Sequence, residues 1–227
     1  MKKHTWKIVL GAFVVCMGLA FWYASYAGEK ANEGVVIENR VKGNTEAKVT
    51  LTEYADFQCP ACAQFNPVLK SIYEEYGSQM AFEFKHFPLV SIHAFAVPAA
   101  KAAEAAGQQG KFYEMHDKLF ENQNVWSKSP TPQAYFTQYA EELELDVDLF
   151  KRHMRASLIE EHIQSQFNEA REKGLTGTPS FFLNGEKLEF TTMEEFRNKI
   201  ETALGVAPAS SETQDETVTG PEVKFGI

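Results

Sequence analysis

A pair of cysteines separated by two residues constrains the fold of this chain more than any other feature. The motif is Cys59-Pro60-Ala61-Cys62, and it lies between a strand-like run and a helix-like run. Pro60 suits the first turn of a helix, because the N–H that proline lacks would have no partner there. Cys59 is then expected at the helix N-terminus, where free N–H groups and the helix dipole stabilise a negative charge. Since the thiolate is the reactive form of cysteine, the motif predicts a redox-active dithiol.

Two other roles for such a cysteine pair are weaker. A structural zinc site needs four ligands, and the sequence has no second CxxC or HxxxH motif to complete one, so no metal is expected. A purely structural disulfide across so short a loop would restrict the unfolded chain little and add little stability. The third cysteine, Cys16, lies in an apolar N-terminal segment and is expected to take no part in the site.

The chain begins with three lysines followed by an apolar run over residues 8–23. The lysines are expected to stay in the cytoplasm while the rest of the chain crosses the membrane. Residues 1–27 are therefore either a signal peptide, cleaved near Ala27, or a membrane anchor formed by residues 8–27. The length of the apolar run and its aromatic end favour the anchor. In both cases the domain that follows is expected outside the cytoplasm.

The formal net charge is −9, and this value includes the three N-terminal lysines, so the remainder of the chain stands at −12. So acidic a body argues against nucleic acid or anionic lipid as a partner. With 44% hydrophobic and 23% charged residues, the composition is that of a folded globular protein.

The rest of the sequence shows a strand–helix–strand order, a long helical region, and a return to strand and helix. Alternation of apolar and polar residues predicts the strands, and apolar spacing of three to four predicts the helices. The predicted elements are strands at 49–54 and 80–87 about a helix at 60–76, helical segments between 94 and 174, a hairpin about Asn184-Gly185, and a final helix from Thr192 to Leu204. A short strand about residues 35–37 is also expected. The first three elements form a unit in which parallel strands are the rule.

This order resembles the DsbA-like branch of the thioredoxin-fold thiol-disulfide oxidoreductases. The resemblance covers residues 48–204, and its specific parts are Asp56-Phe57-Gln58-Cys59-Pro60-Ala61-Cys62 and Gly177-Thr178-Pro179-Ser180-Phe181-Phe182. It implies an α/β, thioredoxin-like fold with an inserted helical subdomain, preceded by one N-terminal hydrophobic segment. The expected divisions are a leader at 1–27, a linker at 28–44, a thioredoxin-like domain at 45–92 and 174–205, the inserted subdomain at 93–173, and an acidic disordered tail at 206–227.

The resemblance also assigns roles to five residues. Cys59 would be the exposed sulfur that forms a mixed disulfide with the substrate, and Cys62 the buried resolving thiol. Pro179 would be cis, which would bring Thr178 beside the cysteines and leave its backbone free to pair with an extended substrate. Glu53, six residues before Cys59, matches a buried acid of thioredoxin-like proteins. Burial would raise its pKa and suit it to relay a proton to Cys62.

One position departs from the family pattern. The strongest oxidants of the family have a histidine where this chain has Ala61, and that histidine stabilises the thiolate. Its absence should move the reduction potential away from the oxidising extreme, which is about −120 mV for DsbA against about −270 mV for thioredoxin. His86 and His93 lie near the end of a predicted strand, but a lone histidine is more often structural, so neither is assigned a role.

The sequence thus predicts an extracytoplasmic enzyme that exchanges the Cys59–Cys62 disulfide with cysteines of translocated polypeptides, chiefly as an oxidant. By resemblance, its re-oxidising partner would be a membrane quinone reductase of the DsbB kind or another membrane electron carrier, and no cofactor is implied. Two alternatives stay open. One is a reductase or isomerase that uses the same site, and the other is a membrane-tethered binding or chaperone module without turnover.

Overall fold

The computed structural model describes residues 2–206. Its elements are α1 (Lys2–Asn32), β1 (Arg40–Gly43), β2 (Val49–Ala55), α2 (Pro60–Tyr76), β3 (Met80–His86), α3 (Ala96–Gly107), α4 (Phe112–Glu121), α5 (Gln123–Trp126), α6 (Pro132–Glu142), α7 (Val147–His153), α8 (Ser157–Glu172), β4 (Ser180–Leu183), β5 (Glu186–Lys187) and α9 (Met193–Leu204). The predicted acidic tail lies, from residue 207 onward, outside the described residues.

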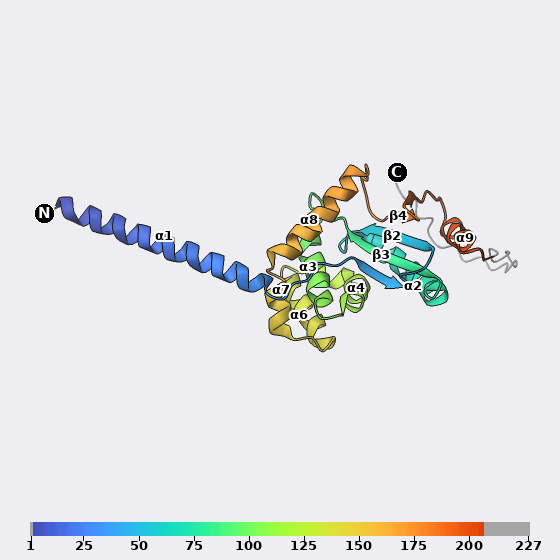
Figure 1. The fold of residues 1–227 in the computed structure, drawn as a ribbon, viewed down its shortest axis with the longest axis horizontal. Helices are drawn as coiled ribbons and strands as arrows, with labels where there is room; N and C mark the ends of the chain where they lie inside the picture. The colour runs from blue at the N-terminus through green and yellow to red at the C-terminus, as the bar shows by residue number, and fades with distance from the viewer. Residues whose placement is uncertain (1, 207–227) are drawn as a thin grey trace.

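A five-stranded sheet forms the centre of the body, with the strand order β1-β3-β2-β4-β5 (Figure 1). β2 pairs with β3 in parallel and with β4 antiparallel, while β1 and β5 are antiparallel edge strands. The parallel pair joined through α2 confirms the strand–helix–strand unit predicted from the sequence. The predicted α/β, thioredoxin-like fold with an N-terminal apolar helix is likewise confirmed.

The edge strand before β2 differs in position from the expected one. We expected a strand about residues 35–37, but the strand that pairs with β3 is β1, at Arg40–Gly43. The backbone of Val36 is occupied by a side chain instead, because its N–H donates to Gln108 Oε1 at 2.7 Å and its carbonyl accepts from Gln108 Nε2 at 2.9 Å. Local alternation could not reveal this contact with α3, which takes the place of strand pairing.

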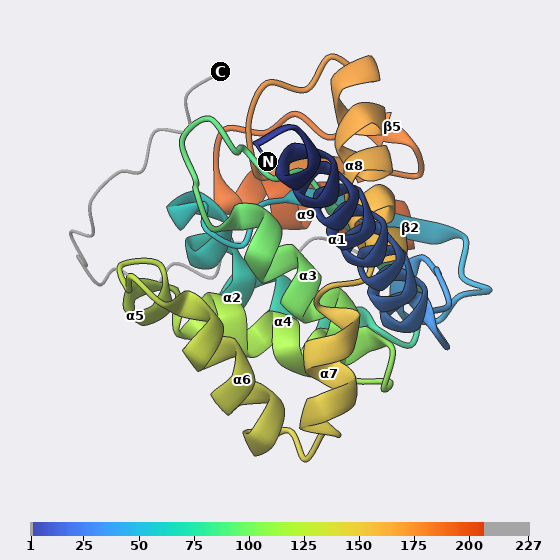
Figure 2. The ribbon, with the colours of Figure 1, turned by 90° about the vertical axis from the view of Figure 1, so that its left-hand side faces the viewer.

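Helices cover both faces of the sheet. On one face, α2 and α9 enclose a core in which Phe65, Phe181 and Phe196 pack ring against ring, with centroids 4.8–5.1 Å apart. On the other side, α3 to α8 form a helical layer that packs around Phe57 and Phe84. Figure 2 shows this layer, with α3 in its middle. Most of the alanines of α3 are fully buried, and their small side chains allow the neighbouring helices to approach closely.

A buried ion cluster joins the helical layer to the sheet. Arg40 Nε of β1 donates to Glu104 Oε2 of α3 at 3.0 Å, and His86 Nε2 at the end of β3 lies 2.9 Å from Glu104 Oε1. Burial by itself would raise the pKa of Glu104, but His86 and Arg40 hold that pKa at about 2. His86, which the sequence left unassigned, is therefore part of the framework that joins α3 to the sheet.

α1 is one continuous helix that projects from the body (Figure 1). Its stretch Val9–Asn32 is long and apolar enough to cross a membrane, and none of its most apolar window is buried against the rest of the chain. A signal sequence would meet the same criterion.

Candidate active site

Both cysteines of the CxxC motif lie where the sequence placed them. Cys59 is the N-cap residue of α2, with extended dihedrals (φ −73°, ψ 120°), and Pro60 opens the helix. The Cys59 N–H donates to the Asp56 carbonyl at 3.0 Å, which closes a tight turn after β2. Cys59 and Cys62 are free thiols in this structure, so it represents the reduced dithiol.

Cys59 is less accessible than the sequence led us to expect. The residue is 7% exposed, whereas Cys62 is completely buried. The cause is the loop before β4, whose Thr178 carbonyl accepts a hydrogen bond from Cys59 Sγ at 3.3 Å. The remaining exposure still belongs to Cys59, so an incoming sulfur meets Cys59 before Cys62.

The loop over Cys59 contains the second predicted motif. The Thr178–Pro179 peptide bond is cis, as the resemblance implied. Ser180 directly after it begins the pairing of β4 with β2 at Tyr54. Two segments more than a hundred residues apart in sequence are thus brought together at the sulfur. Within residues 2–206, the backbone N–H of Thr178 donates no hydrogen bond.

The surroundings of Cys59 favour its thiolate. The pKa of Cys59 is lowered from about 9 to about 6, chiefly because the Cys62 thiol donates a hydrogen bond to it, while partial burial opposes the shift. The Thr178 hydroxyl and the N–H groups of Ala61 and Cys62 contribute further. The pKa of Cys62 is raised well above its usual range, mainly by burial and to a smaller extent by the neighbouring Cys59. One sulfur is therefore prepared as an anion and the other is kept as a thiol.

Thr178→Val should raise the pKa of Cys59. When Cys59 is a thiol it donates to the Thr178 carbonyl, and the buried Thr178 hydroxyl then has no partner of its own, so it is free to donate to the thiolate. A hydrogen bond to a charged group corresponds to roughly one pKa unit or more. Titration of the thiolate absorbance in the far ultraviolet would show the shift. Thr178→Ser, which keeps the hydroxyl, is the control, and an equal shift in both variants would contradict the assignment.

Glu53 lies in β2, where it is in register with Phe84 of β3 and Phe181 of β4. It is 1% exposed, and neither carboxylate oxygen has a hydrogen-bond partner. Burial and, to a smaller extent, the Cys59 charge raise its pKa to about 8. The charge of Glu53 in turn contributes to the raised pKa of Cys62. The structure therefore places Glu53 within electrostatic reach of both sulfurs and largely protonated at neutral pH.

Sequence reasoning missed Asp56, whose buried carboxylate organises the turn. Asp56 Oδ1 accepts the Gln58 N–H at 2.7 Å, and Oδ2 accepts the Leu89 N–H at 2.8 Å and lies 2.8 Å from His93 Nδ1. An aspartate two residues before the turn's end is a recognisable signal for a side-chain-stabilised turn. The contact with His93, by contrast, joins the turn to the loop after β3. His93 is thus a support of the CxxC turn.

Two glutamines support the motif from further away, and no local pattern identifies them. Gln123 of α5 donates from Nε2 to the carbonyls of Phe57 and Cys59, at 2.8 and 2.9 Å. Gln58 accepts the Phe95 N–H at 2.7 Å. Through these bonds the helical layer fixes the backbone on either side of Cys59.

Within the described part of the chain, no group of three or more His, Cys, Asp or Glu side chains is arranged to hold a metal ion. The five residues that the sequence predicted at the site lie together in the structure: Cys59, Cys62, Glu53, Thr178 and Pro179. They come from β2, the start of α2 and the loop before β4.

Comparison with known proteins agrees with this geometry. The thioredoxin family model matches residues 36–202. A thioredoxin-like oxidoreductase from Silicibacter pomeroyi is 26% identical, with a TM-score of 0.62 over 74% of this chain and 94% of that one. Wolbachia pipientis alpha-DsbA1, at 22% identity, has a similar fold, with a TM-score of 0.65 over 75% of this chain and 92% of that one. The fold of Bacillus subtilis BdbD, at 21% identity, is also similar, with a TM-score of 0.64 over 77% of this chain and 95% of that one.

The curated relatives include much larger proteins. The Na(+)/H(+) antiporter NhaA 3 of Salinispora tropica is 39% identical to this chain over 149 residues. The matched region covers 66% of this chain and 22% of the antiporter. The chain thus spans about a fifth of the length of that relative, and the antiporter's name describes the whole of the longer protein. The family match covers most of this chain and includes both the CxxC turn and the cis-proline loop. The chain therefore belongs to the thioredoxin family and has the fold of its DsbA-like thiol-disulfide oxidoreductases.

Proposed function

We propose that this protein is an extracytoplasmic thiol-disulfide oxidoreductase that oxidises cysteines of translocated polypeptides. The observation that carries the proposal is the environment of Cys59: a helix N-terminus, a hydrogen bond from Cys62, and a pKa of about 6. A thiolate of low pKa is a good leaving group, which favours passing a disulfide on to another protein.

The reaction begins with the oxidised protein, in which Cys59 and Cys62 share a disulfide. A substrate thiolate attacks Cys59 Sγ, the Cys59–Cys62 bond breaks, and Cys62 leaves. Because the pKa of Cys62 is well above its usual range, its departure needs a proton, and the protonated Glu53 is the group placed to supply one. A second substrate thiolate then attacks the substrate sulfur and releases the Cys59 thiolate. Two electrons pass to the protein, and the substrate gains a disulfide.

The loop before β4 is the proposed contact for the substrate backbone. The N–H of Thr178 has no partner within the described residues, and it lies beside the sulfur that forms the mixed disulfide. An extended substrate segment could pair with this loop in the manner of an added strand. Pro179 follows directly and belongs to the same contact.

The low pKa of Cys59 predicts a reduction potential above that of thioredoxin and below that of DsbA. A shift from about 9 to about 6 stabilises the reduced form by about 1.4 kcal/mol at pH 7, which corresponds to about 30 mV for a two-electron couple. Equilibration with glutathione buffers measures the value, which we expect between about −270 and −120 mV. A potential at or below −270 mV would instead support the alternative of a reductase.

A third candidate, a tethered binding or chaperone module, would use the fold without turnover. It predicts that oxidised protein fails to transfer a disulfide to a reduced, unfolded polypeptide. We expect instead that the oxidised protein transfers its disulfide to the polypeptide at a rate that depends on Cys59. One molecule of reduced protein should be recovered for each disulfide formed in the polypeptide.

We further propose that α1 holds the protein at the outer face of the membrane, with residues 8–27 as the anchor. Cleavage near Ala27 would release the body, and the mass of the mature N-terminus distinguishes the two outcomes. The re-oxidising partner in this setting would be a membrane quinone reductase of the DsbB kind or another membrane electron carrier.

A further inference from the structure

Hydrogen bonds tie the C-terminal end of α1 to the body. Asn32, the last residue of α1, donates from Nδ2 to Ser157 Oγ at 3.0 Å and accepts the Leu158 N–H on Oδ1 at 3.2 Å, so that it caps the first turn of α8. His153 Nε2, at the end of α7, donates to the Glu33 carbonyl at 3.2 Å. Ala31 is buried against the body. The turn between α7 and α8 is therefore held at the end of α1.

The length of α1 sets the height of this turn above the bilayer. The proposed anchor, residues 8–27, spans about 30 Å as a helix, which matches the hydrocarbon core. Asn32 lies five residues beyond Ala27, or about 7.5 Å further along the axis. The polar layer on each side of the core is roughly 5–8 Å thick. The α7–α8 turn is thus expected at the level of the lipid phosphates.

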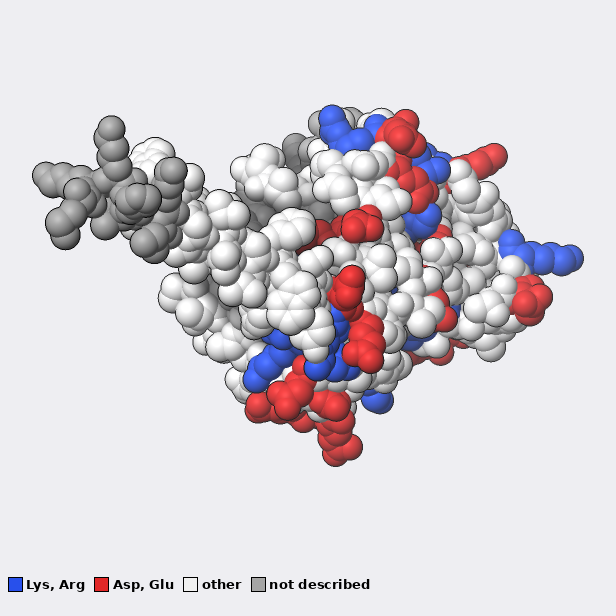
Figure 3. Space-filling view, turned by 60° about the vertical axis from the view of Figure 1, so that its left-hand side comes forward, with Lys and Arg blue, Asp and Glu red and all other residues white. Residues whose placement is uncertain are grey.

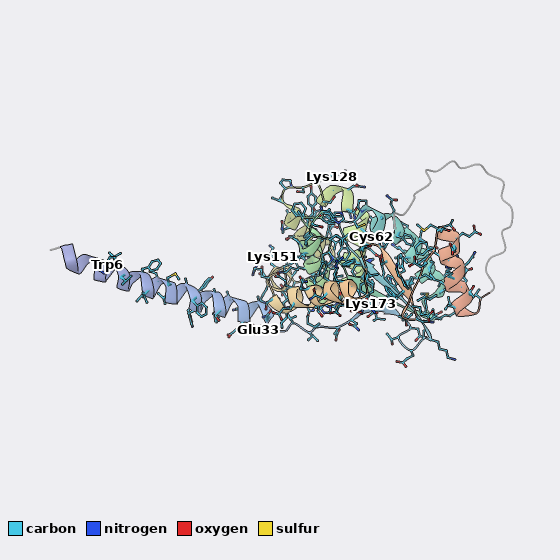
Figure 4. The ribbon with its side chains drawn as sticks, turned by 90° about the horizontal axis from the view of Figure 1, so that it is seen from above. Trp6, Glu33, Cys62, Lys128, Lys151 and Lys173 are labelled. Carbon is cyan, nitrogen blue, oxygen red and sulfur yellow. The ribbon has the colours of Figure 1, made fainter. Side chains whose placement is uncertain are left out.

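Unpaired cations gather at this turn. Lys151 and Arg152 occupy the last turn of α7, and Arg155 follows the helix. Lys151 and Arg155 are exposed, Arg152 is partly buried with no partner for its Nε, and no carboxylate within residues 2–206 forms an ion pair with any of the three. Figure 3 shows a group of Lys and Arg side chains beside the base of α1, with acidic ones around them. Figure 4 shows Lys151 on the side of the body next to α1.

A hollow of about 340 Å³ lies among these cations. Lys101, Lys151 and Arg155 line it together with Phe150 and Met154, and its remaining lining residues are Pro98, Gln133 and Thr137. Lys101 is already paired with Glu160 Oε2 at 2.9 Å, which leaves Lys151 and Arg155 as its free charges. A basic rim above an apolar floor suits a phosphate attached to an apolar chain.

We propose that the α7–α8 turn is a lipid-contact surface that binds the phosphates of anionic phospholipids beside the anchor. The inference rests on the proposed membrane location and adds a partner to it. The net charge of the chain argues against such a partner, but charges act on a membrane surface only within about 10 Å at ordinary salt. Near the turn, Glu160 of α8 is already paired with Lys101, whereas Lys151, Arg152 and Arg155 form no ion pair within residues 2–206 and keep their charge for a bound phosphate. Binding would fix the body, and hence Cys59, in one orientation above the membrane.

A simpler role for Lys151 and Arg152 is to stabilise the C-terminal end of α7 through the helix dipole. That role is independent of lipid, and it does not involve Arg155, which lies beyond the helix. Lipid dependence therefore separates the two explanations.

The test uses the full chain in nanodiscs of phosphatidylcholine, with or without phosphatidylglycerol, and measures amide hydrogen exchange over residues 147–156. We expect phosphatidylglycerol to slow exchange there at least about tenfold at low salt, and added salt to remove the effect. The double variant Lys151→Gln/Arg155→Gln should lose it, and both positions are exposed, so folding should survive. Lys173→Gln/Lys199→Gln removes the same charge at the far end of α8 and on α9, away from α1 (Figure 1), and should keep it.

Each of the following results would overturn the proposal. The first is equal exchange with and without phosphatidylglycerol, or an effect that survives in the Lys151→Gln/Arg155→Gln variant. The second is the same protection from inorganic phosphate in phosphatidylcholine discs, which would indicate a site for free anions. The third is failure of the chain to remain in the discs. Disulfide transfer measured on the same samples shows separately whether the proposed enzymatic function holds.

Discussion

Replacing Cys59 with serine is expected to lower disulfide transfer to the uncatalysed rate, a loss of at least about a thousandfold, as for removal of other catalytic nucleophiles. A hydroxyl can neither accept the substrate sulfur nor leave as a stabilised anion. The site depends on Cys59 because it has the lowered pKa and the residual exposure, whereas Cys62 is buried with a raised pKa. The measurement is the rate at which oxidised protein forms disulfides in a reduced, unfolded polypeptide.

Cys62→Ser provides the matched control. This variant keeps the reactive sulfur but lacks the thiol that resolves the intermediate, so it should accumulate a mixed disulfide between Cys59 and the substrate. Cys16 is exposed on α1, and all variants should therefore carry Cys16→Ser to prevent side reactions. Trapping of substrate through position 62 in the Cys59→Ser protein, at the rate seen for Cys59, would contradict the assigned order of the two sulfurs.

Glu53→Gln is expected to stabilise the protein at alkaline pH by on the order of 5 kcal/mol relative to acid pH. The folded-state pKa of Glu53 is about 8 against an ordinary value of 4.5, and each unit corresponds to about 1.4 kcal/mol. Below pH 4.5 both the folded and the unfolded chain hold the proton. As the pH rises towards 8, only the unfolded chain releases it, so folding of the wild type becomes less favourable, and above 8 the loss levels off.

Urea unfolding of the two proteins in the same redox state, from pH 4 to pH 9, measures this difference directly. Glu83→Gln is the control, because that carboxylate faces Thr52 and Lys85 on the same sheet and has partners for its charge. A Glu53→Gln curve parallel to the wild type would show that Glu53 titrates normally. If Glu53 also supplies the proton to Cys62, the variant should form the mixed disulfide more slowly at neutral pH.

The elements that determine the site locally could be predicted from the sequence. The proline after Cys59 and the strand before it place the sulfur at a helix start, and alternation with Val49 and Leu51 places Glu53 on a buried face. The supports of the site could not be predicted, because each is a long-range contact. Gln123 reaches Cys59 from 64 residues away, and His93 reaches Asp56 from 37.

Two expectations were wrong in detail for the same reason. The edge strand lies at residues 40–43, because Gln108, the C-cap residue of α3, hydrogen-bonds to the backbone of Val36. Cys59 is less exposed than expected, because a loop from the other end of the chain covers it. Periodicity records which face of an element is apolar, but it does not record which distant segment packs on that face.

The pH dependence of Cys59 alkylation shows directly whether Cys59 is a stabilised thiolate. In a Cys16→Ser background, with Cys62 buried and protonated, the rate of reaction with iodoacetamide follows the Cys59 thiolate. We expect an inflection near pH 6. An inflection near 8.5, the value of an ordinary cysteine, would contradict it, since Cys59 would then be neither a stabilised thiolate nor a good leaving group at neutral pH.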